Sequence, residues 1–452
     1  MHRYAQLLLE RTHRIGVWGA GYIGYSTMAH YARRGVASLA VDVSQVRVDA
    51  VNAADVEVIG LQDWLGFDVK SLTEQGLMRA TPNHAELTNG ETLVHFVAVP
   101  TEKDGRPFND YLEDVFAKLA AIEPGDSTLP PLIIIESTLT PGTIDKIVLP
   151  LFEKHHKQLG KDVLLGIAPR RDWFVDGTKS LKELDRVFGG YNEATTETMR
   201  DVLGIVCDVL HAASSYRNAE IVKSCENAYR HVEITLANQI SLAYPGVDIR
   251  EVLRLVGTKW NIGTFAPGFG TGGYCIPLSS QYVLAGAERP EELTILTDTV
   301  RTDTEINRRI ARSIVGKGFK NVGVLGLSYK ADLKVWILSP TLPFVQELMI
   351  LGVNVKLCDP FYSKEEIWRI AGVDAFDFPE GLQEFDAVIA IVDHRQFRTM
   401  SGSALASLDH CKFILDNTGM WQSEKSAFLA RGIDYHVAGD ARWLDGCEVG
   451  SR

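Results

Sequence analysis

The sequence predicts an α/β protein in which two Rossmann-like, doubly wound parallel-sheet domains are joined by a long central helix. Three features support this prediction: a strand, a glycine turn and a helix near the start, a run without proline or glycine over 219–244, and a second series of apolar strands near the end. A chain of 452 residues is also too long for one hydrophobic core. We expect domains over 1–205, 206–312 and 313–452.

Composition narrows the class of protein. The net charge of -12 argues against nonspecific nucleic-acid binding, because no basic surface would contact phosphates. No apolar run reaches the ~18 residues that a membrane span needs. The six cysteines are widely spaced, which predicts reduced thiols in a cytoplasmic protein and no metal site. The opening stretch, 1–14, predicts a short helix before the first strand, not a signal peptide.

The first element is an apolar strand, Ile15–Trp18, and a helix follows over about Tyr22–Arg33. Between and within them stand Gly19, Gly21 and Gly24, in the GxGxxG spacing. The first glycine permits the tight turn, the second lets a pyrophosphate approach the backbone, and the third lets the helix pack on the strand. This context predicts dinucleotide binding at the N-terminus of the helix.

A second strand ends at Asp42. A carboxylate at this place accepts hydrogen bonds from a ribose diol and repels a 2′-phosphate, which favours NAD over NADP. Further strands are expected within 92–101 and 131–139, and both are nearly continuous in apolar residues. Such runs are typical of a parallel sheet that helices cover on both faces.

The middle run, 219–244, predicts a helix about 39 Å long, which would join two domains and pack on a partner subunit. Lys223 and Asn227 are four residues apart and share a face of this helix. A solvated surface lysine is the ordinary interpretation of Lys223. Its apolar neighbours Ile221 and Val222 favour a chemical role instead.

The last part repeats the first in outline. It predicts a strand over Val322–Leu325, a turn from Gly326 to Lys330, and then a helix and three strands within 341–352, 353–360, 385–394 and 412–417. The turn lacks GxGxxG. One glycine and one lysine suit a single nucleotide better than a dinucleotide.

Cys275 lies in the glycine-rich stretch 267–282, where no charged residue stands within four positions. A free cysteine taken alone is most often a small buried side chain. With its motif neighbours the chain resembles the UDP-glucose/GDP-mannose dehydrogenase family. The resemblance spans nearly the whole chain and rests on an ordered set of motifs: the glycine loop, VAVPT, EST with PGT, KSCENAYRHVEITLANQ, GTGGYCIP, GLSYK, DP and DNTG. The helix motif from Glu226 is most similar to the branch that acts on UDP-N-acetylhexosamines.

The resemblance implies an NAD-dependent oxidoreductase that oxidises the C6 alcohol of a UDP-sugar to a carboxylate in two hydride transfers. It implies a cysteine nucleophile, Cys275, which forms a hemithioacetal and then a thioester. Lys223 would stabilise the oxyanion, Asn227 would donate a hydrogen bond, and Thr138 would handle water and protons. It also implies a homodimer through the long central helix, and polysaccharide or glycoconjugate synthesis as the pathway.

The same resemblance assigns the binding residues. The NAD-binding set is Gly19, Gly21, Tyr22, Ile23, Gly24, Asp42, Pro100, Thr101, Glu136 and Thr138. The UDP-sugar set is Arg170, Arg171, Lys223, Asn227, Arg230, Phe265, Gly268, Gly272, Gly273 and Lys330.

Three positions depart from the family pattern. Ser279 stands where an aspartate is usual, and a hydroxyl is no carboxylate base. Arg170 stands where a glutamate is usual; Asp172 or Asp176 could replace that base. The arginine that reaches a neighbouring subunit's substrate falls near Asn261, with Lys259 beside it.

Two interpretations of the arginines remain open: Arg170 and Arg171 pair with nearby aspartates on a loop, or they line a pocket for a more anionic sugar. Two alternatives to full oxidation also remain. One is an enzyme that stops at, or diverts, the 6-aldehyde. The other is a catalytically silent paralogue that binds the sugar nucleotide and NAD.

Overall fold

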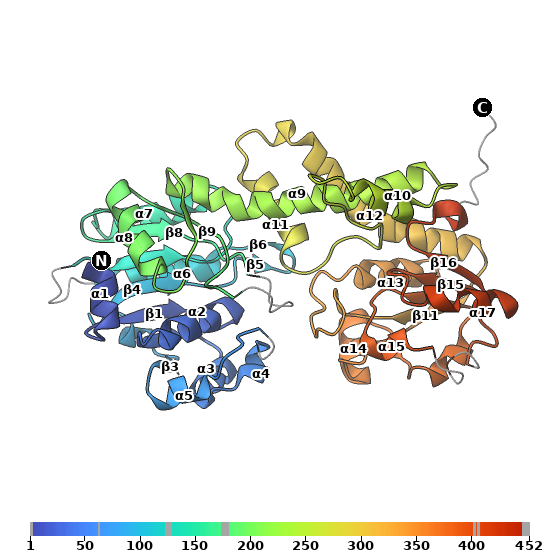
Figure 1. Ribbon diagram of the computed structural model, residues 1–452, viewed down its shortest axis with the longest axis horizontal. Coiled ribbons are helices and arrows are strands. Elements are labelled where there is room, and N and C mark those ends of the chain that lie inside the picture. Colours follow the sequence, from blue (N-terminus) through green and yellow to red (C-terminus); the bar gives the residue numbers. More distant parts are fainter. Residues whose placement is uncertain are drawn as a thin grey trace. The chain divides into compact units, whose positions relative to one another are not determined.

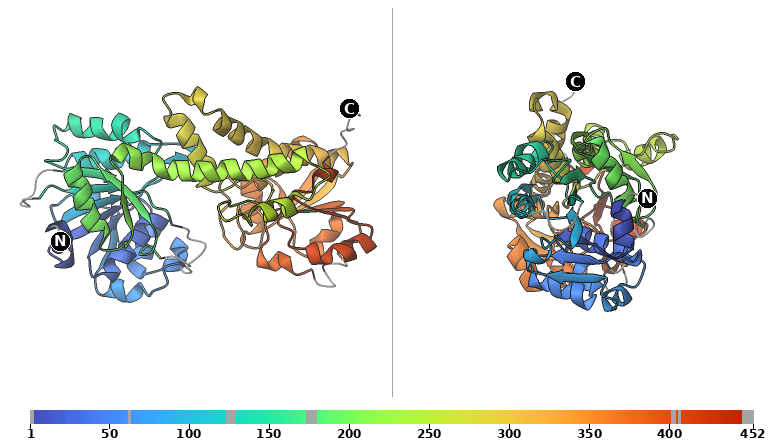
Figure 2. Two further views of the ribbon diagram at one scale, coloured as in Figure 1. Left: turned by 45° about the horizontal axis from the view of Figure 1, so that its top comes forward. Right: turned by 90° about the vertical axis from the view of Figure 1, so that its left-hand side faces the viewer.

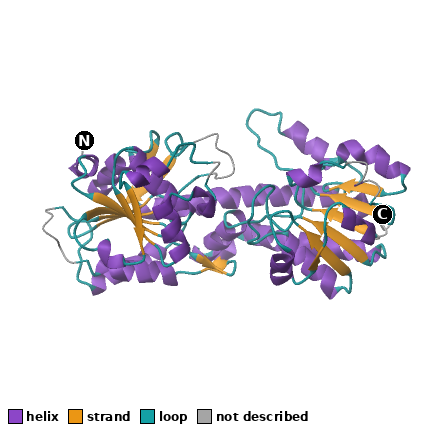
Figure 3. Cartoon of the chain, turned by 90° about the horizontal axis from the view of Figure 1, so that it is seen from below, coloured by secondary structure: helices purple, strands orange, loops and turns teal. Residues whose placement is uncertain are grey.

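The computed structural model describes residues 3–61, 64–122, 129–172, 180–400, 404 and 407–444. The chain divides into two compact units, residues 1–226 with 285–288 and residues 227–284 with 289–452. Each unit contains one large sheet with helices packed around it (Figures 1 and 3), which confirms the predicted α/β class. The separate central domain over 206–312 stays a prediction.

The sheet of the first unit has eight strands in the order β10-β9-β8-β7-β4-β1-β2-β3. The predicted strand over 15–18 is β1, the one ending near Asp42 is β2, and the next two predicted strands are β4 and β7. The strand bounds are β1 (Arg14–Trp18), β2 (Ser38–Val41), β3 (Met78–Thr81), β4 (Thr92–Val97), β7 (Leu132–Ile135), β8 (Leu164–Ile167), β9 (Arg186–Gly190) and β10 (Leu210–Ala212). A short hairpin of β5 (Glu102–Lys103) and β6 (Arg106–Pro107) follows β4.

One pair in this sheet departs from the predicted parallel arrangement. β8 and β9 are antiparallel, with Gly166 opposite Gly190. A parallel neighbour needs a crossover connection, usually through a helix, and the described part of the connection between β8 and β9 contains none. The first sheet is therefore mixed.

Helices cover both faces of the first sheet. They are α1 (Arg3–Leu9), α2 (Tyr22–Arg33), α3 (Gln45–Ala53), α4 (Val56–Ile59), α5 (Lys70–Glu74), α6 (Asp110–Ala120), the π-helix η2 (Ile144–Val148), α7 (Leu149–Lys154) and α8 (Glu193–Leu203). Helix α2 begins and ends where the sequence predicts.

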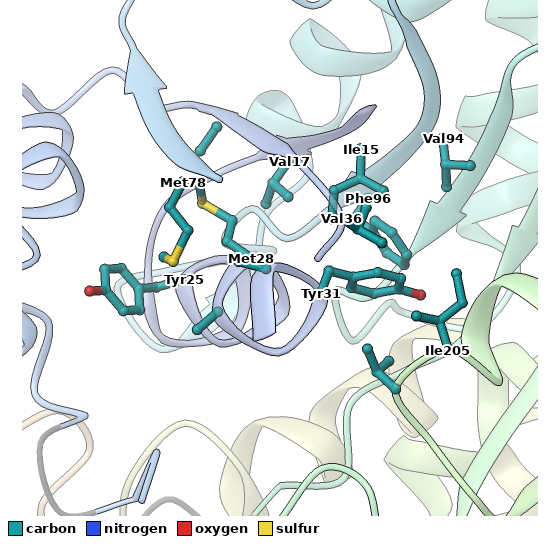
Figure 4. Packing of buried hydrophobic residues seen from close by; sticks show 14 of the residues in the cluster. Ile15, Val17, Tyr25, Met28, Tyr31, Val36, Met78, Val94, Phe96 and Ile205 are labelled. Atoms are coloured by element: carbon teal, nitrogen blue, oxygen red, sulfur yellow. The ribbon is translucent and has the colours of Figure 1, made fainter. Parts of the chain in front are cut away.

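One core cluster of the first unit lies between α2 and the strands (Figure 4). Tyr25, Met28 and Tyr31 are fully buried on α2 and belong to one cluster with Val17 and Phe96 from the strands. The rings of Tyr31 and Phe96 lie 5.2 Å apart between centroids. Full burial of one such side chain stabilises the fold by about 1.5–3 kcal/mol, so this layer fixes α2, and the glycine loop before it, on the sheet.

The sheet of the second unit has six parallel strands in the order β13-β12-β11-β14-β15-β16. The bounds are β11 (Asn321–Leu325), β12 (Asn354–Cys358), β13 (Asp374–Ala375), β14 (Ala387–Ala390), β15 (Phe413–Asp416) and β16 (Asp434–Val437). Its surrounding helices are α13 (Thr341–Ile350), α14 (Lys364–Ala371), α15 (Arg395–Arg398) and α17 (Lys425–Ala430). The strand order reverses between β11 and β14, as it does between β1 and β4 in the first sheet.

The long helix is α9 (Tyr216–Ala243), which contains almost all of the predicted 219–244. The other helices of the central region are α10 (Ile249–Val256), α11 (Ile276–Gly286) and α12 (Thr294–Gly316). α12 runs beside the C-terminal part of α9 (Figures 1 and 2), where Gln239 bonds to Thr302 at 3.3 Å. None of the described helices combines the length and apolarity needed to cross a bilayer.

Candidate active site

The glycine loop lies between β1 and α2. Gly19 has φ +95, a value that favours glycine, and a Cβ on Gly24 would lie 1.8 Å from the carbonyl oxygen of Gly19. Gly21 is the N-cap residue of α2, and a Cβ there would meet nothing closer than the Arg47 guanidinium at 3.8 Å. Among the described side chains none caps α2. The first turn of a helix without a side-chain cap can bind a pyrophosphate, and the loop therefore fits a dinucleotide.

Asp42 follows β2 at the edge of this loop. Its carboxylate accepts the backbone N–H of Ala20 at 2.7 Å and that of Ser44 at 2.8 Å. Arg47 lies 3.6 Å away from the same group. These contacts hold the acidic side chain next to the glycine loop, which is the place where a ribose diol is expected.

The loops after β4 and β7 stand at the point where the strand order reverses, and ligands of such sheets bind there. The Thr101 hydroxyl donates to the carbonyl of Thr138 at 2.6 Å, and that of Ser137 donates to the carbonyl of Val99 at 2.7 Å. The structure thus brings the predicted Thr101 and Thr138 together. Of their predicted companions, Pro100 and Tyr22 are exposed and Ile23 is half-buried.

Two alanine substitutions should separate the roles of the glycines. Gly24→Ala should lower the free energy of unfolding by about 1–3 kcal/mol, because its methyl group collides with backbone. Gly21→Ala should leave the unfolding free energy unchanged but lower NAD affinity at least about tenfold, because the methyl group makes only ordinary contact with Arg47 in the protein but blocks the approach of the pyrophosphate to the backbone. Thermal unfolding and NAD titration calorimetry measure both effects. Equal destabilisation by the two variants would contradict this division.

Arg170 lies in the interior of the first unit, with its side chain 1% exposed. Its guanidinium forms two bonds to Asp172, at 2.6 and 2.9 Å, and also donates to the hydroxyls of Thr27 and Ser26. Of the two open interpretations, the pairing with a nearby aspartate therefore describes Arg170. Asp176 lies outside the described residues.

Glu136, predicted for NAD, belongs to the same buried cluster. It pairs with Arg186, lies 3.7 Å from Arg170, and accepts the hydroxyl of Thr27 at 2.6 Å. Burial opposes the charge on Arg170, but Asp172 and Glu136 outweigh it and raise the pKa of Arg170 above its ordinary value. The cluster is charge-balanced, and in the structure Glu136 binds side chains of its own unit.

Arg171 differs from its neighbour because it is partly exposed. It forms an ion pair of 2.6 Å with Glu226 on α9 and donates to the carbonyl of Asp185 at 2.9 Å. The half-buried Lys223 lies one turn before Glu226. Glu220, a further turn back, accepts the amides of Gly142 and Ile144, and burial raises the pKa of its carboxyl. This end of α9 is thus fixed to the loop that follows β7.

Cys275 is in the second unit, directly before the first residue of α11. It is the exposed thiol among the described cysteines; Cys225 is half-buried, and Cys207, Cys358 and Cys411 are buried. The amide of Ser279 donates to the carbonyl of Cys275 at 3.2 Å and closes the first turn of the helix. The N-terminal end of a helix carries partial positive charge and stabilises anions.

Asn227 and Ser279 lie together below this turn, and both are buried. The Asn227 side-chain amide donates to the Ser279 hydroxyl at 3.0 Å. The hydroxyl that replaces the usual carboxylate therefore orients the predicted hydrogen-bond donor. In the described contacts the Ser279 hydroxyl accepts this hydrogen bond, and none of them would make it a base.

The glycine loop before Cys275 packs against the turn after β11. A Cβ on Gly272 would lie 2.8 Å from the Cβ of Tyr329, and one on Gly273 would lie 2.9 Å from the ring of Tyr329. The amide of Gly273 also donates to the carbonyl of Ile337 at 3.2 Å. The thiol loop thus contacts the turn that contains Lys330.

The remaining predicted substrate residues belong to α9, the glycine-rich stretch before Cys275 and the turn after β11. The amide of Gly268 donates to the side chain of Asn238 at 2.7 Å. Phe265, Arg230 and Lys330 are half-buried. Lys259 and Asn261, near the position of the family's arginine, are exposed.

A buried pair of polar residues, one after β12 and one after β14, was not predicted. The carboxylate of Asp359, after β12, accepts the amides of Leu327 and Ser328 at 2.7 and 3.0 Å. His394, after β14, lies 3.0 Å from the same oxygen. Burial opposes the charged form, but the hydrogen bonds that the carboxylate accepts, first the one from His394, outweigh it and lower the pKa of Asp359. The signal in the sequence is positional, since both residues end predicted strands.

Comparison with solved structures supports this fold. The UDP-D-ManNAc dehydrogenase of Pyrococcus horikoshii superimposes with a TM-score of 0.80 at 23% identity, over 95% of this chain and 100% of that one. The NDP-N-acetyl-D-galactosaminuronic acid dehydrogenase of Methanosarcina mazei gives 0.79 at 21% identity, over 98% and 99% of the two chains.

Relatives in sequence extend over the same length. The UDP-N-acetyl-D-mannosamine dehydrogenase of Methanocaldococcus jannaschii is 27% identical over 95% of this chain and 97% of its own. The NDP-N-acetyl-D-galactosaminuronic acid dehydrogenase of Ralstonia solanacearum is 26% identical over 91% and 97%. Both names agree with the branch that the motif of α9 predicts.

Three domains of one family match the chain. They are the NAD binding domain over residues 13–205, the central domain over 217–309 and the UDP binding domain over 323–423. These matches confirm the predicted cofactor, NAD, and the predicted class of enzyme, an NAD-dependent nucleotide-sugar dehydrogenase. The chain therefore belongs to the UDP-glucose/GDP-mannose dehydrogenase family.

Proposed function

We propose that the protein oxidises the C6 alcohol of a UDP-N-acetylhexosamine to the carboxylate, with UDP-glucose as the less favoured substrate. The observation that carries this proposal is the exposed Cys275 at the start of α11, above the buried bond between Asn227 and Ser279. The names of the relatives from Methanocaldococcus jannaschii and Ralstonia solanacearum favour an N-acetylated sugar.

In the proposed mechanism, two NAD molecules, bound in turn by the loops of the first unit, would supply the hydride acceptor for two successive oxidations. After the first oxidation, the thiolate of Cys275 adds to the aldehyde carbon and forms a hemithioacetal. The ammonium of Lys223 and the amide of Asn227 stabilise the oxygen anion on that carbon. Loss of a second hydride leaves a thioester on the sulfur, and water hydrolyses it to the uronate and the free thiol.

The binding roles follow from the loops described above. Gly19, Gly21 and Gly24 with Asp42 and Thr101 would hold NAD, since their loops meet where the strand order reverses. Gly272, Gly273 and Lys330 would hold the sugar nucleotide, since their loops pack on each other in the second unit. We leave Arg170 and Glu136 out of the ligand sets, because both are buried in ion pairs.

An enzyme that releases the 6-aldehyde is the second candidate. It is favoured by one observation: the two positions where the family has acidic residues hold Ser279, bonded to Asn227, and Arg170, bonded to Asp172. No base for hydrolysis of the thioester stands at either position.

We also propose a homodimer through α9 and α10 in the cytoplasm. On these helices and the loop after them, large apolar side chains are exposed, among them Tyr229, Leu236, Leu255 and Trp260, the last with 92% of its surface accessible. Exposed apolar side chains that gather on one part of a protein mark interaction sites. The widely spaced cysteines are the basis for the location.

One assay tests the reaction. The protein is incubated with NAD and, separately, with UDP-N-acetylmannosamine, UDP-N-acetylgalactosamine, UDP-glucose and GDP-mannose, and NADH yield and product mass are recorded. We expect two NADH per sugar and a uronate from an N-acetylated UDP-sugar. One NADH and an aldehyde that hydroxylamine traps would establish the second candidate. The absence of NADH with every sugar would refute both.

A further inference from the structure

In the second unit, the buried imidazole of His231 meets the buried Ser280 and the half-buried Thr271 and Asp303. His231 on α9 has a side chain that is 2% exposed. Its Nδ1 lies 2.8 Å from the hydroxyl of Ser280 on α11, and its Nε2 lies 3.3 Å from a carboxylate oxygen of Asp303 on α12. The same Nε2 lies 3.4 Å from the hydroxyl of Thr271. We call these four residues the anchoring network.

Within this network Asp303 bonds directly to the loop that precedes Cys275. Its carboxylate accepts the hydroxyl of Thr271 at 2.6 Å and the amide of Thr271 at 3.0 Å. A Cβ on the preceding Gly270, which has φ +102, would lie 2.8 Å from the same carboxylate. The backbone of the loop before Cys275 is therefore packed closely against the carboxylate of Asp303.

The network fixes both sides of Cys275. Thr271 precedes the cysteine in the loop, and Ser280 follows it on α11. Both are bonded to the same imidazole, which Asp303 also contacts. A buried network whose members are hydrogen-bonded makes the surrounding structure rigid.

The order serine, histidine, aspartate is also that of a hydrolytic triad, but the geometry argues against one. Ser280 is 0% exposed, so no substrate can reach its hydroxyl. The ring is also turned the other way, since Nδ1 faces the serine and Nε2 the carboxylate. The network therefore does not react with a substrate itself, and its role is to support the neighbouring Cys275.

We propose that His231 and Asp303 are positioning residues that hold the loop of Cys275 in its reactive place. This inference rests on the proposed role of Cys275 as nucleophile. An error of about 1 Å in the position of a reacting group can cost on the order of a hundredfold in rate, so fixing both flanks of the thiol has a direct chemical effect.

The first test is Asp303→Ala in the full-length protein, with Asp298→Ala as the matched control. Asp298 is an exposed acidic residue of the same helix and pairs only with Arg301 in the described contacts. We expect faster amide hydrogen exchange over 270–276 and a kcat lower by about tenfold to a hundredfold for Asp303→Ala, with unchanged NAD affinity. The control should match the wild type in all three measurements.

Two further variants test the two ring nitrogens of His231 separately. His231→Gln places an amide near the position of Nε2 and should retain the bond to Asp303. His231→Asn places one near Nδ1 and should retain the bond to Ser280. If the contact with Asp303 dominates, His231→Gln keeps more activity than His231→Asn. Asp303→Asn, which keeps an acceptor for Thr271, replaces Asp303→Ala if the latter does not fold.

A double-variant comparison distinguishes positioning of the thiol from general loss of structure. In a Cys275→Ala background, Asp303→Ala should leave the rate of the first NADH turnover unchanged, because the thiol no longer takes part. A lower rate in both backgrounds would overturn the inference, and so would unchanged exchange and kcat in both Asp303→Ala and His231→Asn. If no sugar yields NADH, the proposed function fails, while hydrogen exchange over 270–276 still decides whether the network holds the loop.

Discussion

Cys275→Ala is expected to reduce the NADH yield from two to one per sugar and to lower the steady-state rate of uronate formation by at least about three orders of magnitude. Without the thiol the aldehyde forms no hemithioacetal, so the second hydride has no donor of suitable reactivity. The aldehyde should accumulate, and trapping with hydroxylamine followed by mass measurement would detect it.

Cys225→Ala is the matched control for this experiment. That thiol is half-buried on α9, two residues from Lys223, and burial raises its pKa. Its loss should change the rate by less than about twofold, since a thiol with a raised pKa carries little thiolate and has no part in the chemistry. Two NADH per sugar from Cys275→Ala would rule out the thioester route.

Arg170→Ala should lower the free energy of unfolding of the first unit by about 3–5 kcal/mol at neutral pH. The substitution leaves the buried carboxylates of Asp172 and Glu136 without their shared partner. Hydrogen exchange of the amides in β1, β4 and β7 reports the opening free energy of this unit. Arg171→Ala is the control, because that arginine is partly exposed and its ion pair is worth at most about 1 kcal/mol.

The effect of Arg170→Ala should depend on pH in a defined direction. Burial opposes the charge on Asp172, but Arg170 outweighs it and holds the pKa of Asp172 below its ordinary value. The pair therefore stabilises the fold fully above the ordinary aspartate pKa, and this contribution is lost as the pH falls through the lower folded value. The difference between variant and wild type should be largest at neutral pH and shrink in acid. A difference that grows in acid would contradict this account of the cluster.

The parts of the fold that the sequence predicted depend on local signals. Helix α2 begins and ends where the glycine spacing and the apolar pattern place it, and α9 contains almost all of the run without proline or glycine. The antiparallel β9 was not predicted, because strand direction depends on the connection and not on the residues within the strand.

The predicted part of the site also depends on local sequence signals. The motif around Cys275 is continuous in sequence, so resemblance could locate it. The partner of Arg170 was left open because the decision depends on Ser26, Thr27 and Glu136, which are distant in the chain and reach the arginine only in the folded unit. The anchoring network joins four separate segments, and no short motif contains them.

The packing of Gly272 and Gly273 on Tyr329 has a consequence for what the enzyme can accept. A base and diphosphate seated beside Tyr329 would press on the very stretch of backbone that presents the sulfur. Recognition of the nucleotide part of the substrate and alignment of its reacting carbon with the thiol are then a single event. A free hexosamine has no nucleotide to contact this loop and align the thiol. Even at high concentration it should therefore not be oxidised.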